Sequence, residues 1–263
     1  MKLKHIATCA GLIASSILAF SNAPAQAFSF TTNFSGNNPK GDILLNSVRL
    51  KDGTIIDNFA LANRANIVYN DLWTGGNTGA ASADMGDQAT IGIKQERVDN
   101  NGVVAALGNL NLNSIIDTED SGRSMIDVFF SSAVDNLFFW ERGMNSKLDI
   151  QALDANGRVV GNLLTSHSGK WQYAGYGIDT KEISGTQRVG SLGISLADLG
   201  VASPISGVRV GSQRLYNGPD WKVVGSATSV PEPATLAGLG LVAGAIATSR
   251  RRKVSNPTYS LPG

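Results

Sequence analysis

The stretch Val134-Asp135-Asn136-Leu137-Phe138-Phe139-Trp140 ends in aromatic residues of the kind that favour β-strands. Similar runs recur roughly every ten residues along the middle of the chain, separated by Gly, Asn and Asp. This spacing predicts an all-β fold, a single sandwich or jelly-roll-like domain. The expected strands are Ile43–Leu50, Thr54–Phe59, Thr90–Val98, Met125–Phe130, Val134–Trp140, Leu148–Leu153, Gly157–Leu164, Trp171–Ile178, Gln187–Ile194, Val208–Val210 and Trp221–Val224.

Alternation and turn chemistry support this prediction. Leu148, Ile150 and Ala152 share one face of their strand, with Asp149 and Gln151 on the other. Turn-forming groups, which tolerate positive φ, separate the runs. They are Lys51–Gly53, Asp99–Gly102 and Asp154–Gly157. No amphipathic stretch of helical length is expected.

Composition excludes several classes of protein. With 42% hydrophobic and 16% charged residues in 263, the chain can bury a core and is not disordered throughout. The 22 Lys plus Arg against 21 Asp plus Glu exclude recognition of nucleic acid by bulk charge. One Cys excludes an internal disulfide and a four-thiolate zinc site.

The first segment, residues 1–27, is typical of a Sec signal peptide. Lys2 and Lys4 precede an apolar run over Ile6–Phe20, and Ala25 and Ala27 provide the small residues that signal peptidase accepts. The apolar run is about 15 residues, too short for a membrane span of about 20. We expect cleavage after Ala27, with loss of the single Cys.

The far end, residues 230–253, contains three elements in order. Pro231-Glu232-Pro233 comes first, then an apolar stretch over Leu236–Thr248, then Arg250-Arg251-Arg252-Lys253. The prolines keep the tripeptide extended, and the apolar stretch predicts a short, marginal transmembrane helix. The basic residues are expected to stop transfer and to remain cytoplasmic. Residues 254–263 are expected to form a disordered cytoplasmic tail.

This tripartite arrangement closely resembles the PEP-CTERM sorting signal. The resemblance implies an exosortase as processing partner, a transient anchor in the inner membrane, and delivery to the cell surface or extracellular matrix, where exopolysaccharide is a candidate partner. The remaining core, residues 28–229, has 16 Lys plus Arg and 20 Asp plus Glu, hence a net charge of −4. A mildly acidic exported domain without nucleic-acid contacts is expected.

The core itself resembles a family of exosortase-dependent surface proteins. The similarity rests on Val134–Ser146, Ile150–Asp154 and Asn217–Val223 and implies no enzyme activity. We therefore expect a non-catalytic core, either structural or carbohydrate-binding. For the second role, the candidate glycan contacts are Trp73, Trp171 and Tyr173, whereas Trp140 and Trp221 are expected in the core.

The alternative is a surface or periplasmic glycan-acting enzyme. Glu141 and Asp149 are the candidate carboxylate pair, since glycosidases use two such groups. A structural role in a salt bridge or hydrogen bond is the competing interpretation of Glu141 and Arg142. His167 is the one histidine after residue 27, and its context, Thr-Ser-His-Ser-Gly-Lys, predicts a surface loop.

No cofactor is expected, and no metal site is assigned. A structural calcium ion is the one candidate, because Asp117–Asp120 and Asp154–Gly157 offer the oxygen ligands that calcium takes. Neither segment has EF-hand spacing, and ordinary turns are the competing interpretation.

Overall fold

The computed structural model describes residues 27–72, 74, 81–181 and 185–228. The predicted signal peptide through residue 26, the sorting segment, the tail and Trp73 lie outside these residues. The strands are β1 (Phe30–Ser35), β2 (Leu44–Leu50), β3 (Ile55–Ile56), β4 (Phe59–Ala60), β5 (Ala62–Asn70), β6 (Ala81–Met85), β7 (Ser114–Thr118), β8 (Ser124–Arg142), β9 (Asp149–Leu153), β10 (Val159–Thr165), β11 (Gln172–Ile178), β12 (Gln187–Ser195), β13 (Ile205–Ser212) and β14 (Asp220–Ala227). The helices are α1 (Asn100–Leu107) and the 3₁₀ turn η1 (Ser168–Lys170).

Strand β8 organises the main sheet. Its first half pairs with β5 and β13, and its second half pairs with β12 and β14, all antiparallel. The change of partners falls at Ser131–Ala133, which is exposed. The expected separate strands Met125–Phe130 and Val134–Trp140 are therefore one 19-residue strand.

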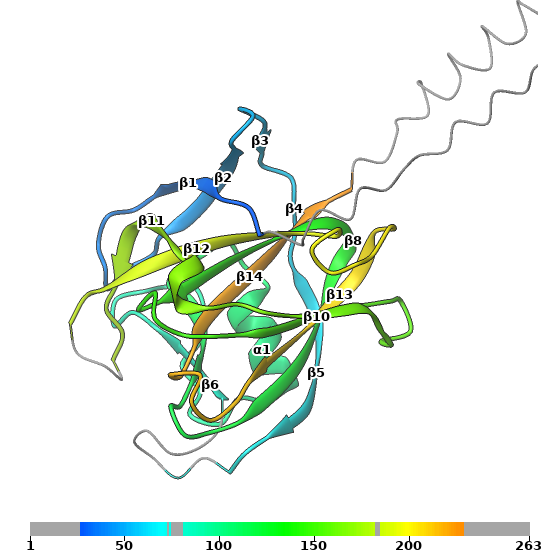
Figure 1. Cartoon of the computed structure of the whole chain (residues 1–263). Helices are drawn as coiled ribbons and strands as arrows, with labels where there is room; N and C mark the ends of the chain where they lie inside the picture. The colour runs from blue at the N-terminus through cyan, green and yellow to red at the C-terminus, as the bar shows by residue number, and fades with distance from the viewer. Residues whose placement is uncertain (1–26, 73, 75–80, 182–184, 229–263) are drawn as a thin grey trace, which may run out of the picture.

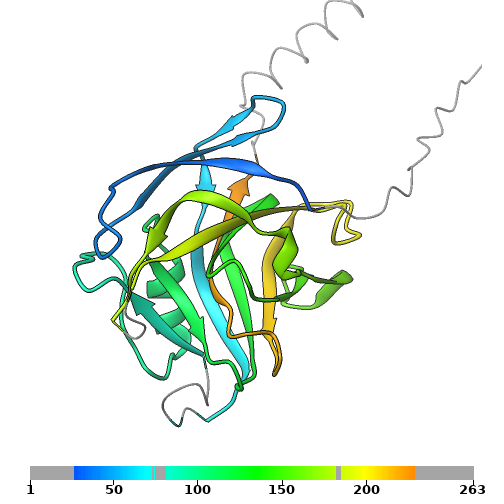
Figure 2. The same ribbon diagram turned by 60° about the vertical axis from the view of Figure 1, so that its left-hand side comes forward.

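The two halves of β8 belong to two layers of an antiparallel sandwich, which confirms the predicted fold class (Figure 1). We call β10-β9-β13-β8-β5 the outer sheet and β11-β12-β8-β14-β7-β6, with β4 beside β14, the inner sheet. A third layer, the cover sheet β1-β2-β3, lies over β11 and β12 in both views (Figure 1, Figure 2).

The second half of β8 is buried on both faces. Leu137 and Phe139 belong to the larger core, shared with the outer sheet. Phe138 and Trp140 belong to a second core beneath the cover sheet. None of the four is more than 1% exposed. A strand covered on both sides needs a continuous apolar run instead of alternation, which explains Leu-Phe-Phe-Trp at this position.

Helix α1 was not predicted, and the expected strand over Thr90–Val98 is wrong. The carboxylate of Asp99 accepts a hydrogen bond of 2.7 Å from the N–H of Gly102, so it caps a helix where the sequence predicted a turn. Val103 and Leu107 are buried in the larger core. Eight residues with a weak apolar face leave little periodicity to detect.

Lys222, on β14, connects the C-terminal end of α1 to the inner sheet through hydrogen bonds. The Nζ atom donates to the carbonyls of Ala106, at 2.9 Å, and Ser114, at 3.1 Å. Burial lowers the pKa of Lys222 to about 7. Its hydrogen bonds satisfy a carbonyl that the helix leaves unpaired at its C-terminal turn.

Phe28, near the start of the described residues, packs against the second hydrophobic core. Phe28 exchanges two backbone hydrogen bonds with Gly193 of β12, at 2.8 and 2.9 Å. Its ring meets Phe138 edge-on, with the centroids 6.1 Å apart. A Cβ on Gly193 would lie 2.2 Å from the Phe28 ring, so the ring occupies the space that only a glycine leaves open.

We therefore predict that Gly193→Ala displaces Phe28 and lowers the free energy of unfolding by about 1–3 kcal/mol, the usual effect of overpacking. Urea unfolding measures the change. In a Phe28→Ala background the same substitution should have a much smaller effect, because the clash is gone. Equal effects in both backgrounds would contradict this account.

Candidate functional site

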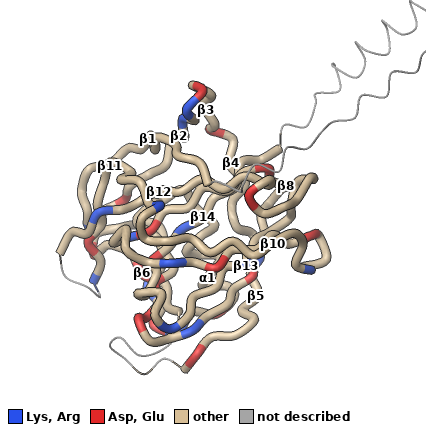
Figure 3. Tube along the Cα trace, viewed as in Figure 1, with Lys and Arg blue, Asp and Glu red and all other residues tan. Residues whose placement is uncertain are grey.

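A polar pocket of about 210 Å³ opens at one end of the inner sheet. We call it the acidic pocket. The ends of four neighbouring strands, β7, β8, β12 and β14, converge there. Its buried floor consists of Asp117, Thr118, Glu119, Arg142 and Asp220, and its rim consists of Asp120, Asn145, Gln187, Asn217 and Gly218. Figure 3 shows acidic and basic positions gathered near the β6, β11 and β12 labels.

An ion pair in the floor joins β8 to β14. Arg142 and Asp220 are directly opposite in the register, and Arg142 Nε donates to Asp220 Oδ2 at 2.7 Å. Arg142 Nη1 donates to Thr180 Oγ1 at 2.6 Å. The third nitrogen, Nη2, is buried and has no hydrogen-bond partner.

Charge around this pair is predominantly negative. Burial by itself lowers the pKa of Arg142, but the carboxylates of Asp220, Asp117 and Asp84 outweigh it and hold the pKa above its ordinary value. Burial raises the pKa of Asp220, and Arg142 opposes that rise. One guanidinium is thus shared among several carboxylates.

The backbone beside the pocket is strained. Three non-glycine residues among those described have positive φ, namely Met144 at 59°, Leu215 at 72° and Asn217 at 61°. All three lie in the two loops that carry the rim residues Asn145 and Asn217. Such conformations persist where the surrounding structure enforces them, and they concentrate at functional sites.

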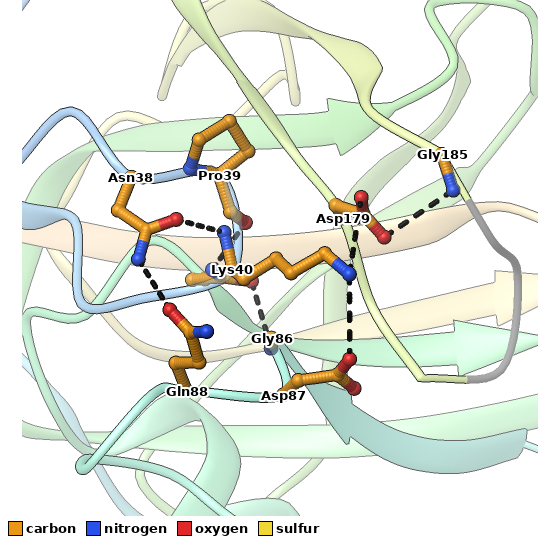
Figure 4. Close-up of polar contacts among 9 residues, drawn as sticks. Asn38, Pro39, Lys40, Gly86, Asp87, Gln88, Asp179 and Gly185 are labelled. Atoms are coloured by element: carbon orange, nitrogen blue, oxygen red, sulfur yellow. Dashed lines mark hydrogen bonds and ion pairs between the residues drawn. The ribbon is translucent and has the colours of Figure 1, made fainter.

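A second group of charges lies on the neighbouring loops, where one lysine lies near two aspartates (Figure 4). Lys40 Nζ lies 3.6 Å from Asp87 Oδ2 and 3.9 Å from Asp179 Oδ2. Asn38 Nδ2 donates to Gln88 Oε1 at 2.7 Å, which ties the same loops together. Lys40 is thus placed between two carboxylates, as Arg142 is in the acidic pocket.

The proposed acid pair does not line the acidic pocket. Glu141 is fully buried, and neither of its carboxyl oxygens makes a hydrogen bond of ordinary geometry. Burial raises its pKa to about 8, although nearby Ser146 and the N–H groups of Met144 and Asn145 oppose the rise. Successive side chains of a strand point to opposite faces of the sheet, so Glu141 lies on the face opposite Arg142.

Asp149, the other candidate, is committed to structural hydrogen bonds. Its carboxylate accepts from Thr165 Oγ1 at 2.6 Å, Gln213 Nε2 at 2.6 Å and Tyr216 Oη at 2.9 Å. These hydrogen bonds favour the structural interpretation of Asp149, and the expected pairing of Glu141 with Arg142 is not observed, because Arg142 pairs with Asp220.

The candidate glycan contacts do not form one exposed platform within the described residues. Trp171 is 5% exposed and its Nε1 donates to the Ser146 carbonyl at 2.9 Å, so its predicted role as a glycan contact is wrong. Tyr173 is 48% exposed, and the guanidinium of Arg188 lies 4.1 Å from its ring centroid. Trp140 and Trp221 are in the cores, as predicted.

The remaining site expectations fall on loops. His167 is exposed and precedes η1. Asp154 Oδ1 accepts from the N–H groups of Asn156 and Arg158, which is turn chemistry.

Across the described ranges, no three or more His, Cys, Asp or Glu side chains are grouped to hold a metal ion. No helix in the described part of the chain combines the length and apolar character needed to cross a membrane.

Sequence reasoning considered parts of this site without bringing them together. Asp117–Asp120 was a calcium candidate, Arg142 a partner for Glu141, and Asn217–Asp220 part of a resemblance. The available signal was charge inside apolar strands, since Arg142 directly follows the aromatic run and Asp220 precedes Trp221. Asn145 and Gln187 had no such signal.

Comparison with known families finds one feature, at the C-terminal end. A family model described as the PEP-CTERM protein-sorting motif matches residues 229–253. A search of curated proteins finds no match. The match spans Pro231, Glu232 and Pro233 and confirms the resemblance to the PEP-CTERM sorting signal. It indicates an exosortase-sorted, exported protein that is transiently anchored at the membrane and processed to the surface.

We predict that Asp220→Asn lowers the free energy of unfolding by about 3 kcal/mol, because it leaves the buried Arg142 without its principal partner. The exposed pair Asp71–Arg123 provides the control. Asp71→Asn should change stability by less than about 1 kcal/mol. If both substitutions lowered the free energy of unfolding in urea equally, burial would not increase the contribution of the Arg142–Asp220 pair to stability.

Glu141 makes a separate prediction about pH. Its pKa is about 8 when folded and near 4.5 otherwise, so the folded state holds the proton more tightly. The stabilising contribution is complete below about pH 4.5 and is lost as pH rises toward 8, by an amount on the order of 4 kcal/mol. Glu141→Gln should remove this loss, so its stability relative to the wild type should increase with pH. Parallel stability curves from about pH 4 to 9 would contradict the assignment.

Proposed function

Because the chain carries a PEP-CTERM sorting motif, we propose that its core is a non-catalytic carbohydrate-binding module displayed at the cell surface or in the extracellular matrix, and that the acidic pocket is its binding site. The observation that carries this proposal is the pocket itself, where carboxylates and amides surround a buried, incompletely bonded arginine.

The chemistry of the lining supports a sugar ligand. Carboxylate oxygens accept hydrogen bonds from hydroxyl groups, and the side-chain amides of Asn145, Gln187 and Asn217 both donate and accept. A volume of about 210 Å³ is below the usual range for drug-sized ligands and suits about one sugar ring. The floor residues lie at the ends of paired strands, so the entropic cost of ordering them when a ligand binds is small.

The position of the pocket supports display. The last described residue, Thr228, donates its N–H to Ala133 on β8, whereas the pocket lies at Arg142, nine residues further along the strand. At ~3.3 Å per residue, about 30 Å separates the two ends of this half-strand. A core held through its C-terminal segment would therefore present the pocket away from the attachment point.

The absence of catalysis is part of the proposal. Glu141, whose raised pKa suits a general acid, lies outside the pocket lining, and Asp220 is engaged by Arg142. A retaining or inverting glycosidase needs two accessible carboxyls on either side of the bond to be cut. Removal of the signal peptide by signal peptidase remains a prediction from the sequence, as does an exopolysaccharide partner.

We predict that the purified full chain in mild detergent binds oligosaccharides on a glycan array without cleaving them. Asn145→Ala combined with Gln187→Ala should reduce binding about tenfold, since each amide loses its hydrogen bonds to the ligand. Asn156→Ala, on an exposed turn away from the pocket, is the control. Binding that survives the double substitution, or release of shortened products, would overturn the proposal.

A further inference from the structure

We propose that a basic groove between the cover sheet and strands β11 and β12 binds an acidic polysaccharide, a chain of sugar rings that carry anionic groups. The groove shares no lining residue with the acidic pocket, so this inference goes beyond the proposed function and does not depend on it.

The groove consists of two adjoining hollows, one of about 380 Å³ and one of about 230 Å³. Ser29, Lys51 and Gln172 line both hollows, so one continues into the other. The other lining residues are Ala27, Phe28, Gly169, Lys170 and Leu192 in the larger hollow and Phe30, Thr31, Arg49 and Leu50 in the smaller one. Here the cover sheet lies over β11 and β12 (Figure 2). Two hollows in a row suit consecutive rings of a chain better than one compact molecule.

The charge of this lining is opposite to that of the core around it. Residues 28–229 contain 20 Asp plus Glu against 16 Lys plus Arg, whereas the groove has three cations and no carboxylate. The cations are Arg49 on β2, Lys51 in the turn that follows β2, and Lys170 in η1. In the described part of the chain, none of these three side chains forms a salt bridge.

The carboxylate of Asp52, the residue after Lys51, is engaged within its own turn. Its Oδ1 accepts a hydrogen bond of 2.9 Å from the N–H of Thr54, and this bond lowers the pKa of Asp52. Asp52 is also exposed and lies outside the lining of both hollows. The groove therefore presents its cations to an anionic ligand without a carboxylate between them.

The exposure of the cations favours a ligand with repeated charges. Arg49, Lys51 and Lys170 are all exposed, so solvent and salt screen each of them and a single ion contact contributes little. A chain that repeats its anionic group can engage several cations at once, and the linked contacts reinforce one another. A small anion can engage only one or two of them.

The uncharged lining favours a sugar chain over an anionic lipid surface. Among the described residues, the side chains of Ser29, Thr31 and Gln172 form no hydrogen bond with one another or with their neighbours, and each can donate to and accept from a sugar hydroxyl. Phe28 is half-buried in the larger hollow and provides apolar surface for the C–H face of a ring. A lipid surface is flat and would contact projecting side chains instead of a recessed groove.

Isothermal titration of the full chain, in a detergent without a sugar headgroup, tests this inference with tetragalacturonate and its methyl ester. The ester has the same rings without the charge. We expect the acid to bind at least tenfold more tightly, with an affinity that falls as salt is added. Equal affinity for the two, or no binding of the acid, would overturn the inference. The acidic pocket is tested with neutral oligosaccharides, so either site can fail without the other.

A matched pair of double variants separates the groove from general attraction of an anion to a cationic surface. Lys51→Gln combined with Lys170→Gln should weaken binding of tetragalacturonate about tenfold. Arg158→Gln combined with Lys181→Gln removes two charges at exposed positions outside the groove and should leave binding within about twofold. Basic residues near the chain ends are common to all of these proteins, so their contribution cancels in the comparison. Equal losses in the two double variants would overturn the inference.

Phosphatidylglycerol added to the detergent micelles distinguishes a sugar chain from an anionic lipid as the ligand. The difference in tetragalacturonate affinity between the wild type and the Lys51→Gln, Lys170→Gln variant should persist in these mixed micelles. Loss of that difference would show that the lipid occupies the groove and would overturn the assignment to a polysaccharide.

Discussion

Residues 137–142 of β8 are removed from water on both faces of the inner sheet, and the position of the other layers follows from that burial. One face must be covered by the outer sheet and the other by β1-β2-β3, since either face left open would expose large aromatic side chains. The same strand then continues through exposed residues 131–133 into the outer sheet. A single strand thus links the layers, and the domain has two cores that share one sheet.

This arrangement has a direct consequence at the end of β8. The strand is still buried at Glu141 and Arg142, so two ionisable groups on opposite faces leave solvent together. Arg142 pairs with Asp220 across the register, whereas burial outweighs the hydrogen-bonding groups near Glu141 and raises its pKa. A buried ion pair seldom stabilises a protein more than a well-packed apolar pair would. This pair lies beside strained loops and an open polar pocket, the site that we propose for ligand binding.

Most of the strands that follow an alternating or apolar run were predicted from the sequence, and the predicted sandwich is confirmed, but β1, β5 and β7 were missed. The predicted break between Phe130 and Val134 was wrong because two exposed serines, Ser131 and Ser132, resemble a turn, while strand β8 continues through them. β6, with the sequence Ala-Ser-Ala-Asp-Met, and the eight-residue helix α1 were missed because short segments of small residues have weak periodicity. Trp171 was misplaced for a different reason: a tryptophan before a strand can turn inward when a backbone carbonyl satisfies its indole N–H.

The sequence by itself determined the all-β class and the C-terminal sorting motif, because both depend on the local order of residue types. Pro-Glu-Pro, an apolar stretch and a basic cluster follow one another within 25 residues, and the family model matches that span. Only the tertiary structure decided which charges meet. Asp117, Arg142 and Asp220 are far apart along the chain, and antiparallel pairing of β7, β8 and β14 places them in one pocket. Strand register depends on packing across the whole sheet, so no local pattern specifies it in advance.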